Sequence, residues 1–249
     1  MARVVLLTND GQSGALAARH LFRHFPGLSV IVEAAQPRRQ FFLRRIKRLG
    51  VITVFGQVLF MLLQRVQQRL SQPRIAQLCA AMGDGGEPAS IFVPSVNSPE
   101  CRARLRDMKP DVVLVMGTRL IDAEVLRETG APFINYHAGI TPKYRGVHGG
   151  YWALAGNDAG NFGITVHLID AGIDTGAVLY QARMTPGRSD NFSTYPYMQL
   201  AAGLPLLAKA AEDAIAGRLA PREVALPSRL WSHPTIWQYL ANGFRRGVW

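Results

Sequence analysis

Residues Phe133 to Tyr180 read FINYHAGITPKYRGVHGGYWALAGNDAGNFGITVHLIDAGIDTGAVLY, and this stretch decides the fold. Its apolar start, with Ala131 to Ile134 as one short run, predicts a buried strand. Two polar residues, Asn135 and His137, stand at the end of that run. Because alternate residues of a strand share a face, we expect both side chains to point into one pocket.

A second β-rich run, Ile164 to Ile169, leads to two carboxylates, Asp170 and Asp174. An Asn, a His and an Asp form a usable set for acyl transfer. The amide can donate to an oxyanion, the imidazole can move protons near neutral pH, and the carboxylate can orient the imidazole or accept a proton. Asp174 precedes Thr175-Gly176 and is the expected catalytic carboxylate, whereas Asp170 fits the opening of a turn. No protein nucleophile stands out, so we expect the attacking group to belong to the substrate.

Three motifs together resemble the folate-dependent formyltransferases: Asn135-x-His137, the loop Pro142 to Gly146, and Asp174-Thr175-Gly176. That family includes glycinamide ribotide transformylase, methionyl-tRNA formyltransferase and sugar-nucleotide N-formyltransferases. The resemblance is strongest over Asp111 to Gln181 and implies that Asn135, His137 and Asp174 are the catalytic residues. One departure is Gly139-Ile140-Thr141-Pro142, where the family usually has Ser-Leu-Leu-Pro. It bears on the substrate more than on the reaction.

The whole chain has 249 residues, and its 28 Lys and Arg against 17 Asp and Glu give a formal net charge of +11. This balance favours an anionic partner. Only Cys79 and Cys101 are present, so we expect a reducing, cytoplasmic setting rather than a disulfide framework. The first residues, Met1 to Val5, read as a strand and not as a signal peptide.

Strands alternating with helices predict an α/β fold, a Rossmann-like and mostly parallel sheet with helices on both faces. Ser98 and Pro99 mark a helix start, and Arg222 to Leu226 is expected as one more strand after Val178 to Ala182. We expect a formyltransferase catalytic domain over residues 1–190 and a short helical extension over residues 191–249. The catalytic domain is predicted to hold a basic and apolar insertion at about 36–72.

The resemblance also implies a pocket for 10-formyltetrahydrofolate as co-substrate. The turn after the first strand is a candidate cradle for a phosphate of the substrate, although an ordinary βα turn explains it as well. For His148, contact with the substrate and simple exposure are equal alternatives, and His167 is expected to have a structural role. No metal site is expected, because no close pair of ligand residues appears. The expected folate-binding residues are Gly117, Thr118, Arg119, Leu120, Ile121 and Asp170, and the expected substrate-binding residues are Asn9, Gly11, Ser13 and His148.

The insertion crowds basic residues over Arg38 to Arg48, and Leu49 to Gln64 then carries no charge. The apolar run is interrupted by Gly50 and Gly56, so it does not predict a spanning helix. Arg38 to Gln64 is a candidate for peripheral contact with an anionic membrane. There are two alternatives to membrane contact: the insertion packs on the domain, or it is a site where nucleic-acid bases stack.

The resemblance implies transfer of a formyl group from 10-formyltetrahydrofolate to a primary amine of a small, anionic metabolite, through a tetrahedral intermediate. Glycinamide ribotide and an amino-sugar nucleotide are the expected acceptors. tRNA is not expected, because methionyl-tRNA formyltransferases carry a C-terminal β-barrel and the end of this chain looks helical. A catalytically inactive formyltransferase fold that serves as a binding or membrane-associated module is the alternative. The oligomeric state is left open.

Overall fold

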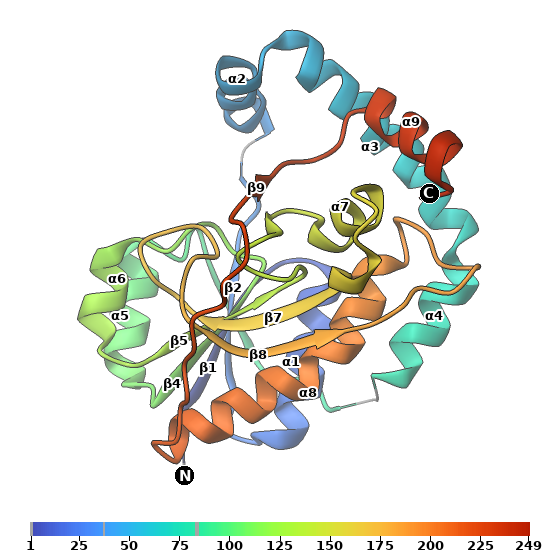
Figure 1. Ribbon diagram of the computed structural model, residues 1–249. Helices are drawn as coiled ribbons and strands as arrows, with labels where there is room; N and C mark the ends of the chain where they lie inside the picture. Colours follow the sequence, from blue (N-terminus) through green and yellow to red (C-terminus); the bar gives the residue numbers. More distant parts are fainter. Residues whose placement is uncertain (1, 37, 83–84) are drawn as a thin grey trace.

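The computed structural model describes residues 2–36, 38–82 and 85–249, with the side chains of 38–42, 44 and 81 left aside. A seven-stranded sheet crosses the molecule, and helices lie on both of its faces (Figure 1). Three helices stand apart from these layers in the same view: α2 (Arg38–Leu49), α3 (Val51–Leu70) and α9 (Ile236–Arg246). We call these three helices the helical lobe.

The sheet has the strand order β3-β2-β1-β4-β5-β7-β8. The first five strands pair in parallel, and β7 and β8 are added antiparallel at the β5 side. The predicted α/β architecture with a mostly parallel sheet is therefore confirmed. The strands are β1 (Val4–Asn9), β2 (Ser29–Glu33), β3 (Ser90–Val93), β4 (Val112–Met116), β5 (Phe133–His137), β7 (Gly163–Leu168) and β8 (Val178–Arg183).

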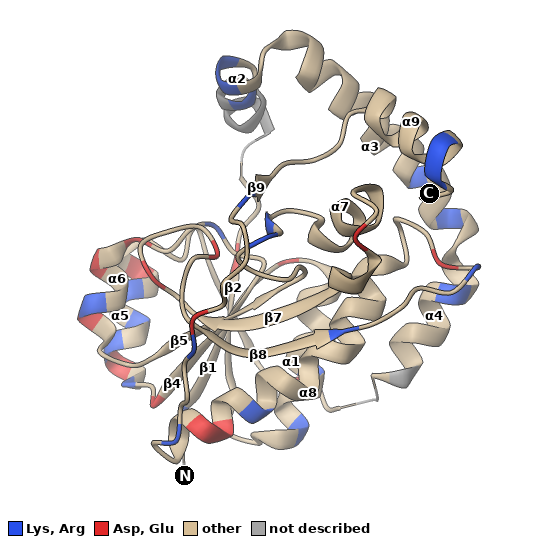
Figure 2. Ribbon diagram, viewed as in Figure 1, with Lys and Arg blue, Asp and Glu red and all other residues tan. Residues whose placement is uncertain are grey.

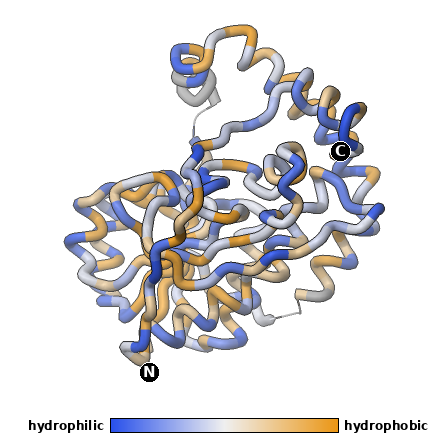
Figure 3. The backbone as a smooth tube through the Cα atoms, viewed as in Figure 1, coloured by the Kyte–Doolittle hydropathy of each residue, from blue (hydrophilic) through white to orange (hydrophobic). Residues whose placement is uncertain are grey.

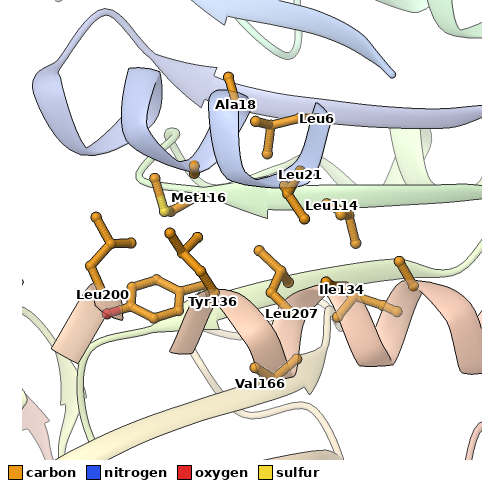
Figure 4. Close-up of a cluster of buried hydrophobic side chains, with 14 of the residues drawn as sticks. Leu6, Ala18, Leu21, Leu114, Met116, Ile134, Tyr136, Val166, Leu200 and Leu207 are labelled. Atoms are coloured by element: carbon orange, nitrogen blue, oxygen red, sulfur yellow. The ribbon is translucent and has the colours of Figure 1, made fainter. Parts of the chain in front are cut away.

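The core lies on both faces of the sheet because the central strands are apolar at nearly every position. In β1, Val4 and Leu6 face the cluster under α1 and α8, while Val5 and Leu7 face the cluster under α5 and α6. Figure 4 shows the first cluster, where Tyr136 of β5 lies close to side chains of α8. The helices in these layers are α1 (Gln12–His24), α5 (Pro99–Met108), α6 (Ala123–Thr129) and α8 (Tyr195–Ile215).

Local signals place several of these boundaries. The Ser98 hydroxyl accepts from the Cys101 N–H at 3.2 Å and caps α5, whose first residue is Pro99, as predicted. The strand expected over residues 222–226 is wrong, since the structure has only one isolated bridge there, between Val178 and Arg222. Val178 of β8 donates its N–H to the Arg222 carbonyl and accepts from the Arg222 N–H, both at 2.9 Å, without a further strand.

The insertion between β2 and β3 is fully helical in its described part. It contains α2 (Arg38–Leu49), α3 (Val51–Leu70) and α4 (Gln72–Ala81). From the far end of the chain, α9 (Ile236–Arg246) returns to pack against α3 (Figure 1). Within the described residues, none of the helices combines the length and the hydropathy needed to cross a bilayer. The remaining elements are β6 (Arg145–Gly146), α7 (Gly149–Ala155), a 3-10 turn (Ala159–Asn161) and β9 (Leu230–Trp231).

The predicted boundary at residue 190 stays a prediction, but the two parts of residues 191–249 behave differently. Helix α8 belongs to the main core, where Leu204 and Leu207 are fully buried. Helix α9 instead belongs to the helical lobe, where it packs on α3. Its contact with α3 depends on Gly56, because a Cβ there would lie 2.8 Å from the Trp237 ring.

The close contact between α8 and β5 predicts that any side chain at Gly203 lowers the free energy of unfolding. A Cβ at Gly203 would lie 2.3 Å from the Tyr136 ring, in the strand that carries Asn135 and His137. We expect Gly203→Ala to lower the free energy of unfolding by about 1–3 kcal/mol through overpacking. Urea denaturation measures this. Gly160→Ala, where no atom lies within 4 Å, is the control, and an equal loss in both variants would contradict the prediction.

Candidate active site

The site is built at the end of β5, between β4 and β7. Asn135 and His137 alternate on this strand and both line the same cavity, as the spacing predicts. Asp174 comes from the loop after β7 and adopts a left-handed conformation with φ of 50°. The three side chains, separated by up to 39 residues, thus meet in one cluster.

The Asp174 carboxylate is the centre of this cluster. Its Oδ2 accepts from the Gly146 N–H at 2.8 Å and lies 3.3 Å from His137 Nδ1. Its Oδ1 accepts from Asn135 Nδ2 at 3.3 Å. The other side of the His137 ring is fixed as well, because Nε2 donates to the Tyr144 carbonyl at 2.6 Å.

His167 also belongs to the cluster, although the sequence pattern favours a structural role for it. Its Nδ1 donates to the Leu168 carbonyl at 2.7 Å, which leaves Nε2 free to accept. Nε2 lies 3.0 Å from Asn135 Nδ2 and 3.5 Å from Asp174 Oδ1. His167 thereby orients the Asn135 amide. It does so because it pairs directly opposite Asn135 on the antiparallel strand β7, a register that the sequence alone does not reveal.

Burial and charge act against each other on the protonation of this cluster. Burial raises the pKa of Asp174, but His137, His167 and the Gly146 N–H outweigh it and hold that pKa at about 2. Burial lowers the pKa of His137, although the Asp174 carboxylate and the Tyr144 carbonyl oppose this. Burial is the largest of these influences, so the net shift of the His137 pKa is downward, and Nδ1 of the ring faces the Asp174 carboxylate.

The cluster opens into a cavity of about 590 Å³. Most residues expected from the sequence as ligand contacts line it. Gly11 is the exception, because it does not reach the cavity and instead donates its N–H to the Asn9 carbonyl within the turn, at 2.9 Å. The expected residues that line the cavity are Asn9, Ser13, Gly117, Thr118, Arg119, Leu120, Ile121, His148 and Asp170.

Two turns shape the cavity rim. Asp170 Oδ1 accepts from the Gly172 N–H at 2.9 Å and from the Thr175 hydroxyl at 2.6 Å, so its carboxylate holds the loop that delivers Asp174. Asn9 Nδ2 donates to the Gly117 carbonyl at 2.8 Å. Gly117 has φ of +72°, and a Cβ there would lie 2.7 Å from Asn9 Nδ2. Close approach and positive φ together explain a glycine at this position.

Glu33, at the end of β2, is a further residue that the sequence does not single out. Its side chain is only 4% exposed and accepts from the backbone N–H groups of Val96 and Arg119, both at 2.9 Å. The Arg119 guanidinium lies 3.5 Å away and donates to the carbonyls of Pro94 and Ala34. This buried ion pair joins the loops after β2, β3 and β4, and so fixes the cavity wall at 117–121.

His148 connects the cavity to the helical lobe. Its Nε2 lies 2.9 Å from His233 Nδ1, and the His233 carbonyl accepts from Gln57 of α3 at 2.7 Å. Burial lowers the pKa of His148 to about 3 and that of His233 to about 4, and each is lowered further by nearby positive charge. Across the described ranges, no group of His, Cys, Asp and Glu is placed to hold a metal ion.

Comparison with known proteins gives consistent matches. A family described as formyl transferase matches residues 64–195. A methionyl-tRNA formyltransferase of Koribacter versatilis is 42% identical over 89 residues, which cover 35% of this chain and 28% of that protein. One of Synechocystis is 32% identical over 123 residues, which cover 49% of this chain and 37% of that protein. The chain thus spans about a third of the length of these relatives.

Two solved structures share the fold at low sequence identity. One is described as a likely sugar N-formyltransferase from Mycobacterium tuberculosis, with a TM-score of 0.59, 15% identity and coverage of 93% of this chain and 75% of that one. The other is a glycinamide ribonucleotide transformylase from Symbiobacterium toebii, with a TM-score of 0.58, 18% identity and coverage of 93% and 95%.

The buried pair of Glu33 and Arg119 predicts a stability loss when one charge is removed. We expect Glu33→Gln to lower the free energy of unfolding by about 3 kcal/mol, because the Arg119 guanidinium and two N–H groups lose their carboxylate. The control is Glu87→Gln, which breaks the ion pair with Arg19 at a side chain that is 78% exposed. The control is expected to cost less than about 1 kcal/mol. Equal losses in urea denaturation would contradict the burial argument.

The depressed pKa values of His148 and His233 predict acid sensitivity. In the unfolded chain, each imidazole takes up a proton once the pH falls below the ordinary imidazole pKa near 6.5. In the folded protein the pKa is about 3 for His148 and about 4 for His233, so both stay unprotonated to a lower pH. The free energy of unfolding is therefore highest above about pH 6.5. It falls as the pH drops, by about 2 kcal/mol per imidazole at pH 5. In denaturation curves from pH 8 to 5, His233→Gln should lose less stability than wild type. The exposed His24→Gln variant should follow wild type, and parallel curves for all three would refute this.

Proposed function

The chain belongs to the formyl transferase family, and we propose on this basis that it transfers a formyl group from 10-formyltetrahydrofolate to a primary amine of a small metabolite. The observation that carries the proposal is the convergence of Asn135, His137 and Asp174 at one wall of the cavity. A carboxylate that is only 13% exposed lies next to both of the other side chains.

The cavity suits a folate in size and lining. Its volume of about 590 Å³ falls within the usual range of small-molecule sites. Met116, Leu120 and Ile121 offer apolar surface next to the backbone groups of the 117–121 loop, which we assign to folate binding. When bound, 10-formyltetrahydrofolate supplies the formyl group and, at N10, the leaving nitrogen.

His137 and Asp174 are placed to share a proton in the free site. His137 Nε2 already donates to the Tyr144 carbonyl, so a proton arriving at Nδ1 would meet Asp174 Oδ2 at 3.3 Å. We assign the proton transfer to His137 and Asp174 together. They take up the proton from the attacking amine and deliver it to N10 of the folate. Overall, the amine gains a bond to the formyl carbon, the carbon–N10 bond breaks, and one proton moves from the amine to N10.

Asn135 is assigned to the oxygen of the transferred formyl group. Its Nδ2 has two hydrogens, which His167 and Asp174 accept in the free site. Exchange of one of these contacts for the formyl oxygen supplies a donor where negative charge develops. His167 keeps the amide in the orientation that presents Nδ2 rather than the carbonyl oxygen.

The acceptor is proposed to be an anionic amine, either glycinamide ribotide or an amino-sugar nucleotide. A solved neighbour from Helicobacter canadensis is described in complex with folinic acid and dTDP-3-aminofucose. Methionyl-tRNA is the second candidate, because the curated relatives carry that name.

Substitution of the three residues tests the reaction. We expect Asn135→Ala to lower kcat by about 10²–10³, and His137→Ala or Asp174→Ala to lower it by at least about 10², with the circular dichroism spectrum unchanged. The measurement is release of tetrahydrofolate with glycinamide ribotide, an amino-sugar nucleotide or methionyl-tRNA as acceptor. His24→Gln is the control. Full activity in any one of the three variants would remove that residue from the mechanism.

Calorimetry with a non-reactive 10-formyl-folate analogue separates binding from chemistry. Micromolar binding by wild type and by Asp174→Ala would place the donor in the cavity and assign Asp174 to the chemical step. No binding by folded wild type would overturn the transferase proposal and favour the inactive binding module. Turnover with methionyl-tRNA alone would keep formyl transfer and overturn the small-metabolite acceptor.

A further inference from the structure

The positive charge of this protein is concentrated in two segments of the chain. Residues 34–83 and 224–249, which contain the helical lobe, carry twelve Arg and Lys and no Asp or Glu. The remainder of the chain has sixteen basic and seventeen acidic residues, so it is almost neutral. Figure 2 shows the described part of α2, α3 and α9 with basic positions and no acidic ones.

The same segments expose apolar side chains. Of the eighteen large apolar side chains that are exposed in the described part of the chain, thirteen lie on α2, α3 and α9 or at Trp249. Helix α3 has two faces: Val54 and Phe60 are buried, whereas Ile52, Phe55 and Leu62 are 79%, 56% and 50% exposed. Figure 3 shows hydrophobic stretches along this outer arc of helices.

The exposed apolar residues of α3 recur at helical spacing. Ile52, Phe55, Leu62, Val66 and Leu70 are all exposed and lie three, seven, four and four residues apart, which keeps them near one side of the helix. A solvent-facing stripe of this kind is unusual for a helix whose opposite face is already buried.

Helix α9 extends this surface. Trp237, Leu240 and Phe244 are 48%, 37% and 80% exposed at positions i, i+3 and i+7, and Arg245 and Arg246 follow. The two helices pack on each other, so their apolar side chains belong to one end of the molecule (Figure 1). Exposed Arg65 and Arg69 stand on the last turns of α3.

We propose that the helical lobe docks on the surface of an anionic lipid bilayer, with α3 and α9 lying in the interface. Aliphatic and aromatic side chains flanked by Arg and Lys, with no acidic residue among them, match an apolar layer beneath negatively charged headgroups. A second copy of the chain fits less well, because its lobe would bring equal positive charge to the contact. Nucleic acid matches the charge but gives no partner to exposed Ile52, Leu62, Val66 and Leu70.

The lobe is joined to the catalytic cavity, so docking would hold the cavity beside the bilayer. Gln57, on the buried face of α3, donates to the His233 carbonyl and accepts from Arg45 of α2. His233 in turn contacts His148, which lines the cavity. This proposal goes beyond the proposed formyl transfer, and lipid binding is measured without any turnover, so either one can fail independently of the other.

Co-sedimentation of the full chain with vesicles tests the proposal. The probes are vesicles of phosphatidylcholine alone and of phosphatidylcholine with phosphatidylglycerol at about three to one. We expect at least tenfold tighter binding to the anionic vesicles and a loss of binding at high salt, because headgroup attraction is screened. Absence of binding to the anionic vesicles by folded protein would overturn the proposal.

Matched variants locate the surface. We expect Ile52→Ser with Phe244→Ser to weaken anionic-vesicle binding at least tenfold, whereas Phe92→Ser, which is 61% exposed on β3 outside the lobe, leaves it unchanged. Arg65→Gln with Arg69→Gln should weaken it, and Arg104→Gln with Arg127→Gln on α5 and α6 should not. Equal effects of lobe and control variants would overturn the proposal. Displacement of the vesicles by tRNA would also overturn it. A dimer that sedimentation velocity detects without vesicle binding, and that Ile52→Ser abolishes, would overturn it as well.

Discussion

A single, mostly buried carboxylate, that of Asp174, holds the candidate site together. It brings a strand, an antiparallel neighbour and a loop to one point, because Asn135, His137, His167 and the Gly146 N–H all turn toward it. A buried negative charge is tolerated only when such partners surround it. The two histidines are fixed from the other side, because His137 Nε2 donates to the Tyr144 carbonyl and His167 Nδ1 donates to the Leu168 carbonyl. Each imidazole therefore turns its second nitrogen toward the same carboxylate.

Much of this could be predicted from the sequence, because its signals are local. The alternation of Asn135 and His137 needs only the geometry of a strand, and the start of α5 needs only Ser98 and Pro99. His167 and Glu33 could not be recognised in this way. Their roles depend on strand neighbours that are far away in the chain: β5 opposite β7 for His167, and the loops after β3 and β4 for Glu33. The charge state of His137 likewise depends on burial, which no motif encodes.

For the insertion, the sequence predicts the composition but not the packing. Its composition predicts a basic and apolar segment but does not say which apolar residues find partners. The structure divides them: Phe60 lies in an aromatic cluster with Phe192 and Tyr239, while Ile52 and Leu70 remain exposed. The partners of the buried face, Phe192 and Tyr239, lie more than 130 positions away in the chain. Local periodicity therefore identifies the helix but not its orientation.

The seam between α3 and α9 has an evolutionary consequence. Gly56 leaves room for the Trp237 ring, and Gln67 donates to the Tyr239 hydroxyl at 2.8 Å. Neither helix can be lost alone without leaving the other with an uncovered apolar face. The insertion and the C-terminal helix should therefore be inherited as a pair, present together or absent together among homologues, even though nearly the whole catalytic sequence separates them in the gene.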